Sequence, residues 1–316
     1  MTYHYFTCEE VRPGVYAAIV KDGKGALGNA GFVNLGEETL IFDTFMLPQA
    51  AAELRAAAEE LTGNTVKYVI NSHYHGDHTN GNVTFKDTTI ISTATTKNMM
   101  IEALKGRSKE EVKAGLASYV KHLKERIAIE TNECMWQALV YDLSDKQLLA
   151  NSLDLLELTP PNILLEDKLV IEGSARQVEI YHYGGGHTAS DTFMYVPDAK
   201  VLYSGDLVLV NTHAWMGSGQ PQEWLKILTK VESFSIDALI PGHGPVGSAT
   251  DIQHMRSYLT GMIEYVSNCK TSQHTLEDIL QLPVPQQYEQ LAGANVYEWN
   301  VQFLFQYLQE RVVPQS

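Results

Sequence analysis

The run HYHGDH at residues 73–78 constrains this chain more than any other feature, because it directly follows a β-rich segment, residues 66–71. Residues two apart in an extended segment point the same way, so His73 and His75 can converge on one ion. A turn at Gly76 would direct the aspartate and histidine that follow it toward a second position. Imidazole and carboxylate groups are suitable ligands for zinc and similar divalent ions, so the run predicts a metal site at a strand end.

Three later segments each add one candidate ligand after a predicted strand. Three glycines precede His187 and let the backbone turn sharply, Asp206 ends the run YSGD, and His243 lies in the run PGHGP. We expect His187 to join the first ion, His243 to join the second, and the two oxygens of Asp206 to bridge them. Four such segments in one order argue against coincidence. The expected ligand set is His73, His75, Asp77, His78, His187, Asp206 and His243.

The remaining pattern alternates strands and helices, which predicts one α/β (α+β) unit built from two strand–helix halves. Helices begin at Pro48 and Pro221, because proline suits the first turn of a helix. We expect a single domain, residues 1–316, with a helical insert at residues 93–160 and C-terminal helices at residues 250–316. The insert is a hairpin packed on the main domain, a cap over the site or an oligomer contact. The expected strands are residues 15–20, 31–35, 39–43, 66–71, 168–172, 177–183, 192–196, 200–205 and 237–241.

Composition narrows the classes of function. Lys and Arg number 23 against 38 Asp and Glu, a net charge of −15, which weighs against binding of nucleic acid or an anionic membrane through a basic face. No stretch approaches the ~20 apolar residues of a membrane span, and the first ten residues lack the features of a secretory signal peptide. The widely spaced Cys8, Cys134 and Cys269 form no disulfide framework, so we expect reduced, buried thiols in a cytoplasmic protein.

The motifs resemble those of the metallo-β-lactamase superfamily over about residues 15–250. The resemblance implies a four-layer αββα sandwich with the metals at one edge, between two β-sheets. It also implies that Asp43, in the run LIFDT, supports the metal-binding loop, since residues behind metal ligands orient them. We expect a similar supporting role for Ser190 and Asp191. Members with a cysteine ligand carry it at the position of Asp206, so this chain looks more like glyoxalase II thioesterases and lactonases.

The resemblance implies a hydrolase with two divalent metal ions. A hydroxide shared by the ions would attack the carbonyl of a small-molecule ester, thioester, lactone or β-lactam. We expect zinc, with iron or manganese as alternatives, and expect Asp77 to orient the nucleophile. The rival functions are a phosphodiesterase or nuclease, a persulfide dioxygenase with one iron, and a non-catalytic metal-binding protein. A homodimer is one option for the partner state. An apolar substrate pocket is expected, with core packing as the alternative, from Phe45, Met46, His213, Trp215 and Met216.

Overall fold

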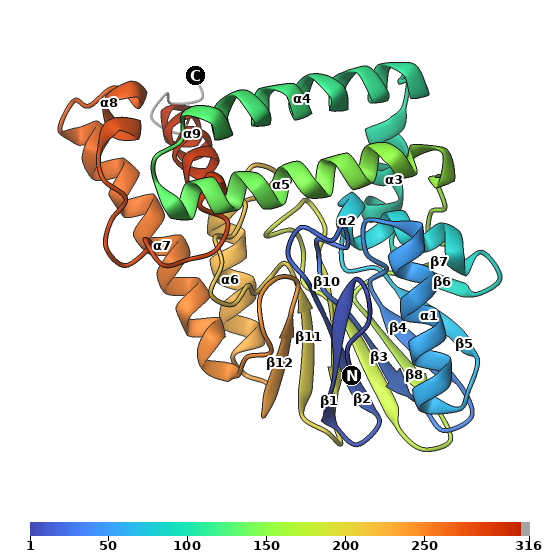
Figure 1. Cartoon of the computed structure of the whole chain (residues 1–316). Coiled ribbons are helices and arrows are strands. Elements are labelled where there is room, and N and C mark those ends of the chain that lie inside the picture. The colour runs from blue at the N-terminus through green and yellow to red at the C-terminus, as the bar shows by residue number, and fades with distance from the viewer. Residues whose placement is uncertain (311–316) are drawn as a thin grey trace.

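Two β-sheets lie face to face at the centre of the computed structural model, which describes residues 1–310 (Figure 1). The first sheet follows the order β1 (Phe6–Arg12), β2 (Val15–Val20), β3 (Ala30–Asn34), β4 (Thr39–Phe42), β5 (Val66–Ile70), β6 (Thr89–Thr93) and β7 (Ile163–Leu165). The second follows the order β12 (Ala238–Pro241), β11 (Val201–Gly205), β10 (Thr192–Val196), β9 (Gln177–His182) and β8 (Lys168–Glu172). In the first sheet the strands from β1 to β4 pair antiparallel, and those from β4 to β7 pair parallel. In the second sheet β11 and β12 pair parallel, and the other pairs are antiparallel.

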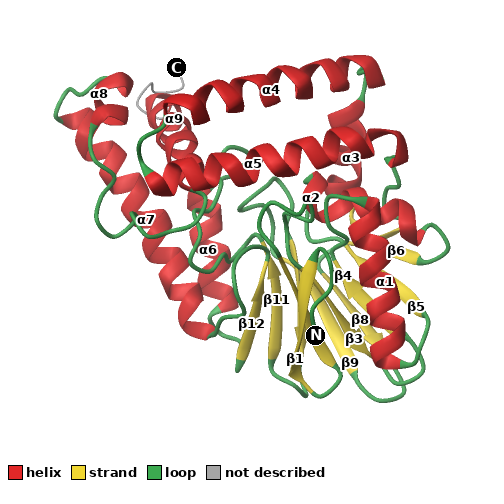
Figure 2. Ribbon diagram, viewed as in Figure 1, coloured by secondary structure: helices red, strands yellow, loops and turns green. Residues whose placement is uncertain are grey.

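Helices cover the two outer faces of this pair of sheets (Figure 2). α1 lies on the first sheet, whereas α6 and α7 lie on the second. The helices are α1 (Pro48–Thr62), α2 (Gly76–Thr79), α3 (Ala94–Leu104), α4 (Lys109–Ile129), α5 (Glu133–Ser152), α6 (Pro221–Val231), α7 (Ala249–Thr271), α8 (Leu276–Gln281) and α9 (Ala294–Glu310), with 3-10 turns at Asn80–Phe85 and Leu153–Leu155.

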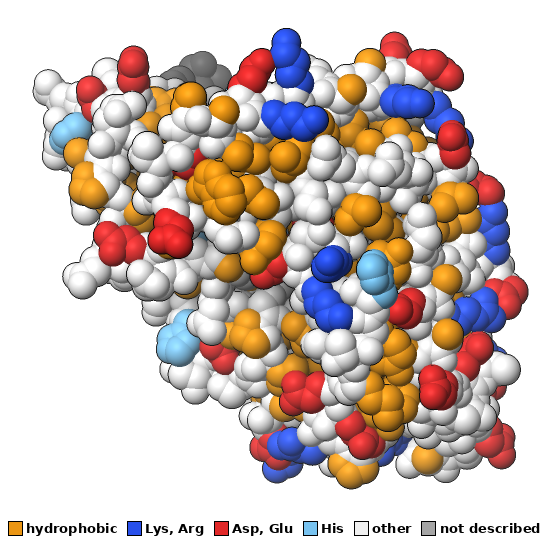
Figure 3. All heavy atoms as spheres, in the orientation of Figure 1, with side chains coloured by type: hydrophobic (Ala, Val, Ile, Leu, Met, Phe, Trp, Pro, Cys, Tyr) orange, Lys and Arg blue, Asp and Glu red, His pale blue; other side chains and the backbone are white. Residues whose placement is uncertain are grey.

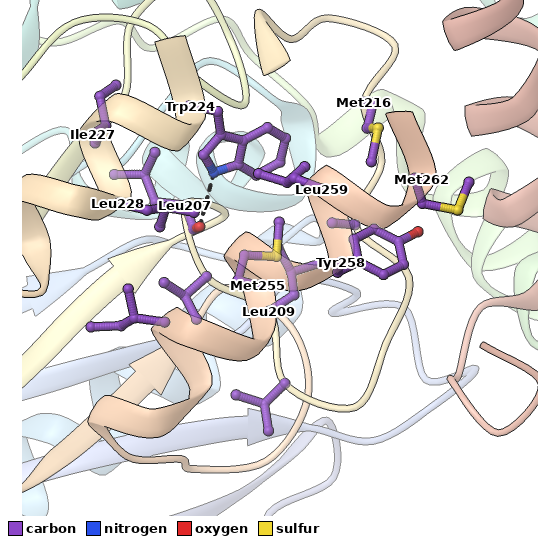
Figure 4. Packing of buried hydrophobic residues seen from close by; sticks show 14 of the residues in the cluster. Leu207, Leu209, Met216, Trp224, Ile227, Leu228, Met255, Tyr258, Leu259 and Met262 are labelled. Carbon is purple, nitrogen blue, oxygen red and sulfur yellow. Dashed lines mark hydrogen bonds between the residues drawn. The ribbon is translucent and has the colours of Figure 1, made fainter. Parts of the chain in front are cut away.

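Three clusters of buried apolar side chains hold the four backbone layers together. Leu54 of α1 belongs to the cluster on the outer face of the first sheet. The rings of Phe42 and Tyr203, 5.5 Å apart, lie in the cluster between the two sheets. Trp224 of α6 and Leu259 of α7 belong to the cluster on the second sheet (Figure 4). This is the four-layer αββα sandwich that the resemblance in sequence implies, with one β-sheet on each side of the cluster that contains Phe42 and Tyr203.

The sequence of α1 shows how one of these layers forms. Pro48 occupies the first turn, where its missing N–H needs no partner. Gly63 ends the helix at φ 71°, a left-handed conformation that glycine adopts without a steric penalty. The buried positions recur at intervals of three and four residues, which places them on one face: Ala50, Ala51, Leu54, Ala57 and Ala58.

The predicted helical insert consists of α3, α4 and α5, and α4 packs along α5 as a hairpin. Figure 1 shows the hairpin lying across the end of the sandwich that also carries α2. Asp145 of α5 accepts a hydrogen bond of 2.7 Å from the Gly25 backbone, in the loop between β2 and β3. At its other side, Arg126 of α4 pairs with Glu298 of α9 at 3.0 Å. The insert is therefore attached both to the sandwich and to the C-terminal helices.

The predicted strands all occur within one or two residues of their expected bounds. β1, β6 and β7 were missed, in part because β1 alternates with charged residues and β7 has only three residues, two of them exposed. The expectation that all three cysteines are buried is wrong for Cys134, which is exposed on α5. The helical prediction for residues 311–316 lies outside the described residues. Within the part of the chain that the structure describes, no helix has the length and hydropathy of a membrane span. The face of the molecule seen in Figure 3 carries acidic and basic side chains scattered among polar and apolar ones.

Candidate metal centre

All seven candidate ligands meet at one edge of the sandwich. His73 follows β5, and α2 carries Asp77 and His78 directly after it. Asp206 follows β11 and His243 follows β12, two neighbouring parallel strands. The carboxyl ends of parallel strands lie at the same edge of a sheet, which is why Asp206 and His243 lie together. The motif after β5 belongs to the other sheet, and the Thr192 backbone N–H, which donates to the Ser72 carbonyl at 2.7 Å, joins the two sheets beside it.

The first group of ligand atoms surrounds one point. The ring nitrogens His73 Nε2 and His75 Nδ1 are 2.9 Å apart, and His187 Nε2 is 3.1 Å from the same His75 atom. Asp206 Oδ2 lies 3.2 Å from His187 Nε2 and 3.9 Å from His73 Nε2. All four ligand atoms lie within 4.8 Å of one another. The loops therefore bring together the three histidines expected around the first ion.

The second group lies on the other side of Asp206. Asp77 Oδ2 is 3.4 Å from His78 Nε2 and 3.3 Å from His243 Nε2. Asp206 reaches this group as well, because its Oδ1 is 3.2 Å from His78 Nε2 and its Oδ2 is 3.4 Å from His243 Nε2. The carboxylate of Asp206 thus touches both groups, which is the placement that a bridging ligand requires.

These distances are compatible with ligand atoms that share divalent ions. Two nitrogen or oxygen ligands at a tetrahedral angle around zinc are roughly 3.3 Å apart, given metal–ligand bonds of about 2.0–2.1 Å. His78 Nε2 and Asp206 Oδ1 are buried, 3.2 Å apart, and neither has a hydrogen-bond partner. Buried polar atoms without a partner are rare, so these two indicate ligands for a metal ion rather than a defect in packing. The residues present fit a pair of metal ions.

The pKa values show how strongly these groups depend on one another. Burial opposes the positive charge on His243, but the carboxylates of Asp206 and Asp77 outweigh it and raise its pKa to about 10. For His187 burial prevails and lowers the pKa to about 3. Burial raises the pKa of Asp206, but His243 and His78 hold it well below its ordinary value. A divalent ion would replace these shared protons, since metal ligands bind in their deprotonated form.

Asp43 lies behind the loop that carries the candidate ligands and makes hydrogen bonds to it. Its Oδ1 accepts a hydrogen bond of 2.7 Å from the Ser72 backbone, and its Oδ2 accepts one from the Ser72 hydroxyl. Oδ2 also lies 2.9 Å from His78 Nδ1, which must carry the proton and leave Nε2 free as a ligand. Ser72 Oγ in turn lies 2.9 Å from His73 Nδ1. Ser72 was not identified from the sequence, and its position directly before the motif was the only signal.

His75 faces the centre with Nδ1, so its Nε2 points the other way. That atom lies 3.5 Å from the hydroxyl of Ser218, which also contacts the Tyr74 hydroxyl at 3.0 Å. Neither residue was among the sequence-based candidates, although the loop after β11 was expected near the site through Trp215 and Met216. Tyr74 and Ser218 are therefore additional residues of the site.

Ser190 and Asp191 act on the loop that carries His187, not on its ring. The carboxylate of Asp191 accepts hydrogen bonds from the backbone of Gly186 and Thr188. The Ser190 carbonyl accepts a hydrogen bond from the Thr188 hydroxyl. His187 Nδ1 is buried and has no hydrogen-bond partner. The two residues fix the path of the backbone on either side of the ligand.

Of the expected pocket residues, only Trp215 reaches the centre. Its ring lies 5.1 Å from that of His75 and 6.3 Å from that of His187, and it is partly exposed. The expectation that the others line an open pocket is wrong, because the closed packing of the core leaves each of them almost without accessible surface: Phe45 0%, Met46 3%, His213 3% and Met216 0%.

Two glycines let the backbone approach the ligands closely. A Cβ at Gly242 would lie 1.9 Å from Asp206 Oδ1, and one at Gly28 would lie 2.6 Å from His78 Cε1. Both contacts are too short for any side chain. Gly242 was part of the predicted run PGHGP, whereas Gly28 belongs to the β2–β3 loop and was found only in the structure.

Comparisons with known proteins agree with this geometry. The sequence profile of the metallo-beta-lactamase superfamily matches residues 23–243. The type 2 metallo-beta-lactamase of Bacteroides fragilis is 26% identical over 106 residues, which cover 32% of this chain and 43% of that protein. The match thus spans less than half the length of this curated relative.

Solved structures show the same fold at low sequence identity. A metallo-beta-lactamase from Pontibacter korlensis has a TM-score of 0.57 and 18% identity, and the match covers 81% of this chain and 99% of that one. The DIM-1 metallo-beta-lactamase has a TM-score of 0.58 and 16% identity over 81% of this chain and 98% of its own. At such identities the likeness concerns the fold alone.

Proposed function

Because the chain belongs to the metallo-beta-lactamase superfamily, we propose that it is a metal-dependent hydrolase that uses two divalent ions to cleave a carbonyl compound. The proposal depends on one observation above all, the two adjacent groups of ligand atoms with Asp206 between them. The ligand atoms are nitrogen and oxygen, with no sulfur. Such a set suits zinc and is also compatible with iron or manganese.

Two divalent ions in such a site supply a hydroxide nucleophile at neutral pH and a Lewis acid that polarises the substrate carbonyl. No serine or cysteine nucleophile is then required. His73, His75 and His187 would hold one ion and Asp77, His78 and His243 the other, with Asp206 contacting both.

We assign to Asp77 the role of orienting the nucleophilic water. Its side chain is 16% exposed, against 6% for Asp206 and 1% for Asp43, so it is the carboxylate of the centre that solvent reaches most easily. One of its oxygens faces His78 and His243. The other can accept a hydrogen bond from the attacking water, and this bond would orient the water toward the carbonyl.

Trp215 provides the apolar surface next to the centre. Its partly exposed indole lies against His75 and His187, on the side of the first ligand group. An apolar acyl group or ring bound there would place its carbonyl beside the ligands. We therefore propose an ester, thioester, lactone or β-lactam with an apolar substituent as the substrate, and the all-His/Asp ligand set favours the thioesters and lactones.

The function is tested by metal analysis combined with a substrate panel. The protein is loaded separately with zinc, manganese and iron, and bound metal per chain is measured. Each form is then assayed with lactones, thioesters, esters and β-lactams, with and without a chelator. We expect two ions per chain, and turnover that the chelator abolishes and added metal restores.

Two paired variants separate the centre from the rest of the surface. His243→Ala should lower the metal content toward one ion per chain, whereas His254→Ala, at an exposed histidine on α7, should leave it unchanged. Asp206→Ala should abolish turnover. A metal-replete protein with less than one ion per chain, or an Asp206→Ala variant with full activity, would contradict the proposal. Oxygen consumption by an iron form with one ion per chain would replace it with dioxygenase chemistry.

A further inference from the structure

The loop that carries Trp215 is held from behind by a buried amide. Asn300 of α9 is fully buried, and its Oδ1 accepts a hydrogen bond of 2.8 Å from the Met216 backbone. Its Nδ2 donates to the Ala214 carbonyl at 2.7 Å. One side chain thus makes hydrogen bonds to the backbone on both sides of Trp215, and these bonds hold the loop as the hydrogen bonds of a neighbouring strand would.

A chain of further hydrogen bonds fixes the orientation of this amide. The second hydrogen of Asn300 Nδ2 is donated to the Tyr258 hydroxyl oxygen at 3.0 Å. The Tyr258 hydroxyl also lies 2.9 Å from His213 Nδ1, so the amide, the tyrosine and the histidine form one connected group. Every hydrogen-bonding atom of the amide is therefore used. The Met216 N–H needs an acceptor and the Ala214 carbonyl needs a donor, so the amide has only one orientation that satisfies both.

The clamp, formed by Asn300 and Tyr258, makes hydrogen bonds to the Trp215 loop and to His213, and the hydrogen bonds given for these two residues include none to the seven ligands. Met216 and Tyr258 lie within the apolar cluster on the outer face of the second sheet, together with residues of α7 (Figure 4). The far side of the loop faces the centre, where Trp215 lies against His75. The clamp and the ligand groups are thus on opposite sides of one short segment.

The clamp also lies in a part of the chain that the superfamily profile does not match. The profile ends at residue 243, whereas Tyr258 belongs to α7 and Asn300 to α9. The helices that follow the sandwich are therefore joined to the candidate centre through specific polar contacts, in addition to apolar packing.

We infer that Asn300 is a positioning residue that sets the place of Trp215 beside the metal centre, so that the C-terminal helices of this chain determine which apolar substituents its site accepts. The specificity part of this inference rests on the proposed hydrolase function, whereas the mechanical part does not. Without the amide, Ala214 and Met216 lose the two bonds that hold the backbone around Trp215. The loop would then open without any change in the ligands themselves.

The mechanical part is tested by the fluorescence of Trp215 in the metal-free protein. Spectra of a Trp215→Phe variant are subtracted, because the chain has three other tryptophans. Asn300→Ala should cause a severalfold rise in acrylamide quenching of Trp215, since its loop is no longer held. Tyr258→Phe keeps both backbone bonds but removes the partner that orients the amide, so we expect a smaller rise. Tyr288→Phe is the matched control, because it removes a buried hydroxyl in the same cluster that has no hydrogen-bond partner.

A second measurement separates the clamp from the ligands. Co²⁺ is titrated into wild type, Asn300→Ala and Tyr258→Phe, and its stoichiometry and affinity are measured by competition with a chelator. We expect both to remain within twofold of wild type, while the Trp215 component of the Co²⁺-induced quenching changes. With a turned-over substrate from the panel, Asn300→Ala should raise KM more than it lowers kcat, and should have no further effect in a Trp215→Ala background.

Each outcome decides the matter. A folded Asn300→Ala protein with wild-type quenching of Trp215 would overturn the inference, and so would a loss of Co²⁺ affinity as large as the change in quenching. Additive effects of Asn300→Ala and Trp215→Ala on KM would overturn its specificity part. If Asn300→Ala does not fold, the Tyr258→Phe and Tyr288→Phe pair decides, and equal quenching in the two would refute the clamp. A wild-type protein that binds no Co²⁺ refutes the proposed function, and the acrylamide experiment still tests the clamp.

Discussion

Substitution of Asp43 by asparagine should weaken metal binding by moving the protons on the two histidines that its side chain orients, His78 directly and His73 through Ser72. Asp43 lies at φ 60°, and asparagine tolerates this left-handed region as well as aspartate does. The backbone should therefore stay in place, and the side chain keeps its size. The change then replaces one carboxylate oxygen by an NH₂ group and removes a charge.

The geometry determines which oxygen is replaced. Oδ1 must continue to accept from the Ser72 backbone, so the new amide nitrogen will occupy the place of Oδ2, 2.9 Å from His78 Nδ1. An NH₂ group there donates to His78 Nδ1 and moves the ring proton to Nε2. It also cannot accept from the Ser72 hydroxyl, which then donates to His73 Nδ1 and moves that ring proton to His73 Nε2. A protonated Nε2 has no lone pair for an ion. Loss of such an orienting partner typically weakens metal binding by about 10–100-fold, or roughly 1.4–2.8 kcal/mol.

The assay is a competition between the protein and a chromophoric chelator, fitted for two ions per chain. We expect Asp43→Asn to bind both ions more weakly than wild type, because His78 and His73 belong to different ligand groups. Asp145→Asn is the matched control, since it also changes a buried carboxylate that accepts a backbone hydrogen bond, but in the insert and away from the ligands. Equal affinities of Asp43→Asn and wild type for both ions would refute the tautomer argument.

Three further outcomes follow from the structure. Gly242→Ala should lower the metal content and should reduce the unfolding free energy by about 1–3 kcal/mol, because its Cβ would lie 1.9 Å from Asp206 Oδ1. An unchanged melting curve and an unchanged metal content would contradict this. His243 has its pKa raised from 6.5 to about 10 in the metal-free protein, so its contribution to stability is complete below pH 6.5 and is lost as the pH rises through 10. The melting temperature of the metal-free protein should fall over that range more steeply than that of a His243→Gln variant, and parallel curves would count against it. Burial raises the pKa of Asp145 from 3.8 to about 7, so the ionised carboxylate destabilises the fold increasingly as the pH rises through that range. In denaturant titrations, Asp145→Asn should therefore gain stability relative to wild type between pH 4 and pH 7. A difference in stability that does not change with pH would be evidence against it.

Short-range signals in the sequence were sufficient to identify most strands of the sandwich and the set of candidate ligands. The run at residues 73–78 follows a buried strand directly, and Asp206 and His243 follow strands of their own with a glycine beside each. Such patterns of neighbouring residues do not depend on tertiary contacts. β11 and β12 are parallel neighbours, so the strand ends that precede Asp206 and His243 lie side by side. β5 belongs to the other sheet and β9 is antiparallel to its neighbours, so the convergence of all the ligands also depends on how the two sheets pack.

The surroundings of the ligands, by contrast, depend on tertiary contacts. Trp215 and Met216 are adjacent and both apolar, yet one faces His75 and the other is fully buried. The difference arises because Asn300, 84 residues away from Met216, makes hydrogen bonds to the backbone of Ala214 and Met216 and so fixes the direction of each side chain. Long-range hydrogen bonds of this kind leave no periodicity in the sequence. The contacts of Asp43 and Ser72 with the histidines are of the same type, which explains why Ser72, Ser218 and Asn300 could be assigned only from the fold.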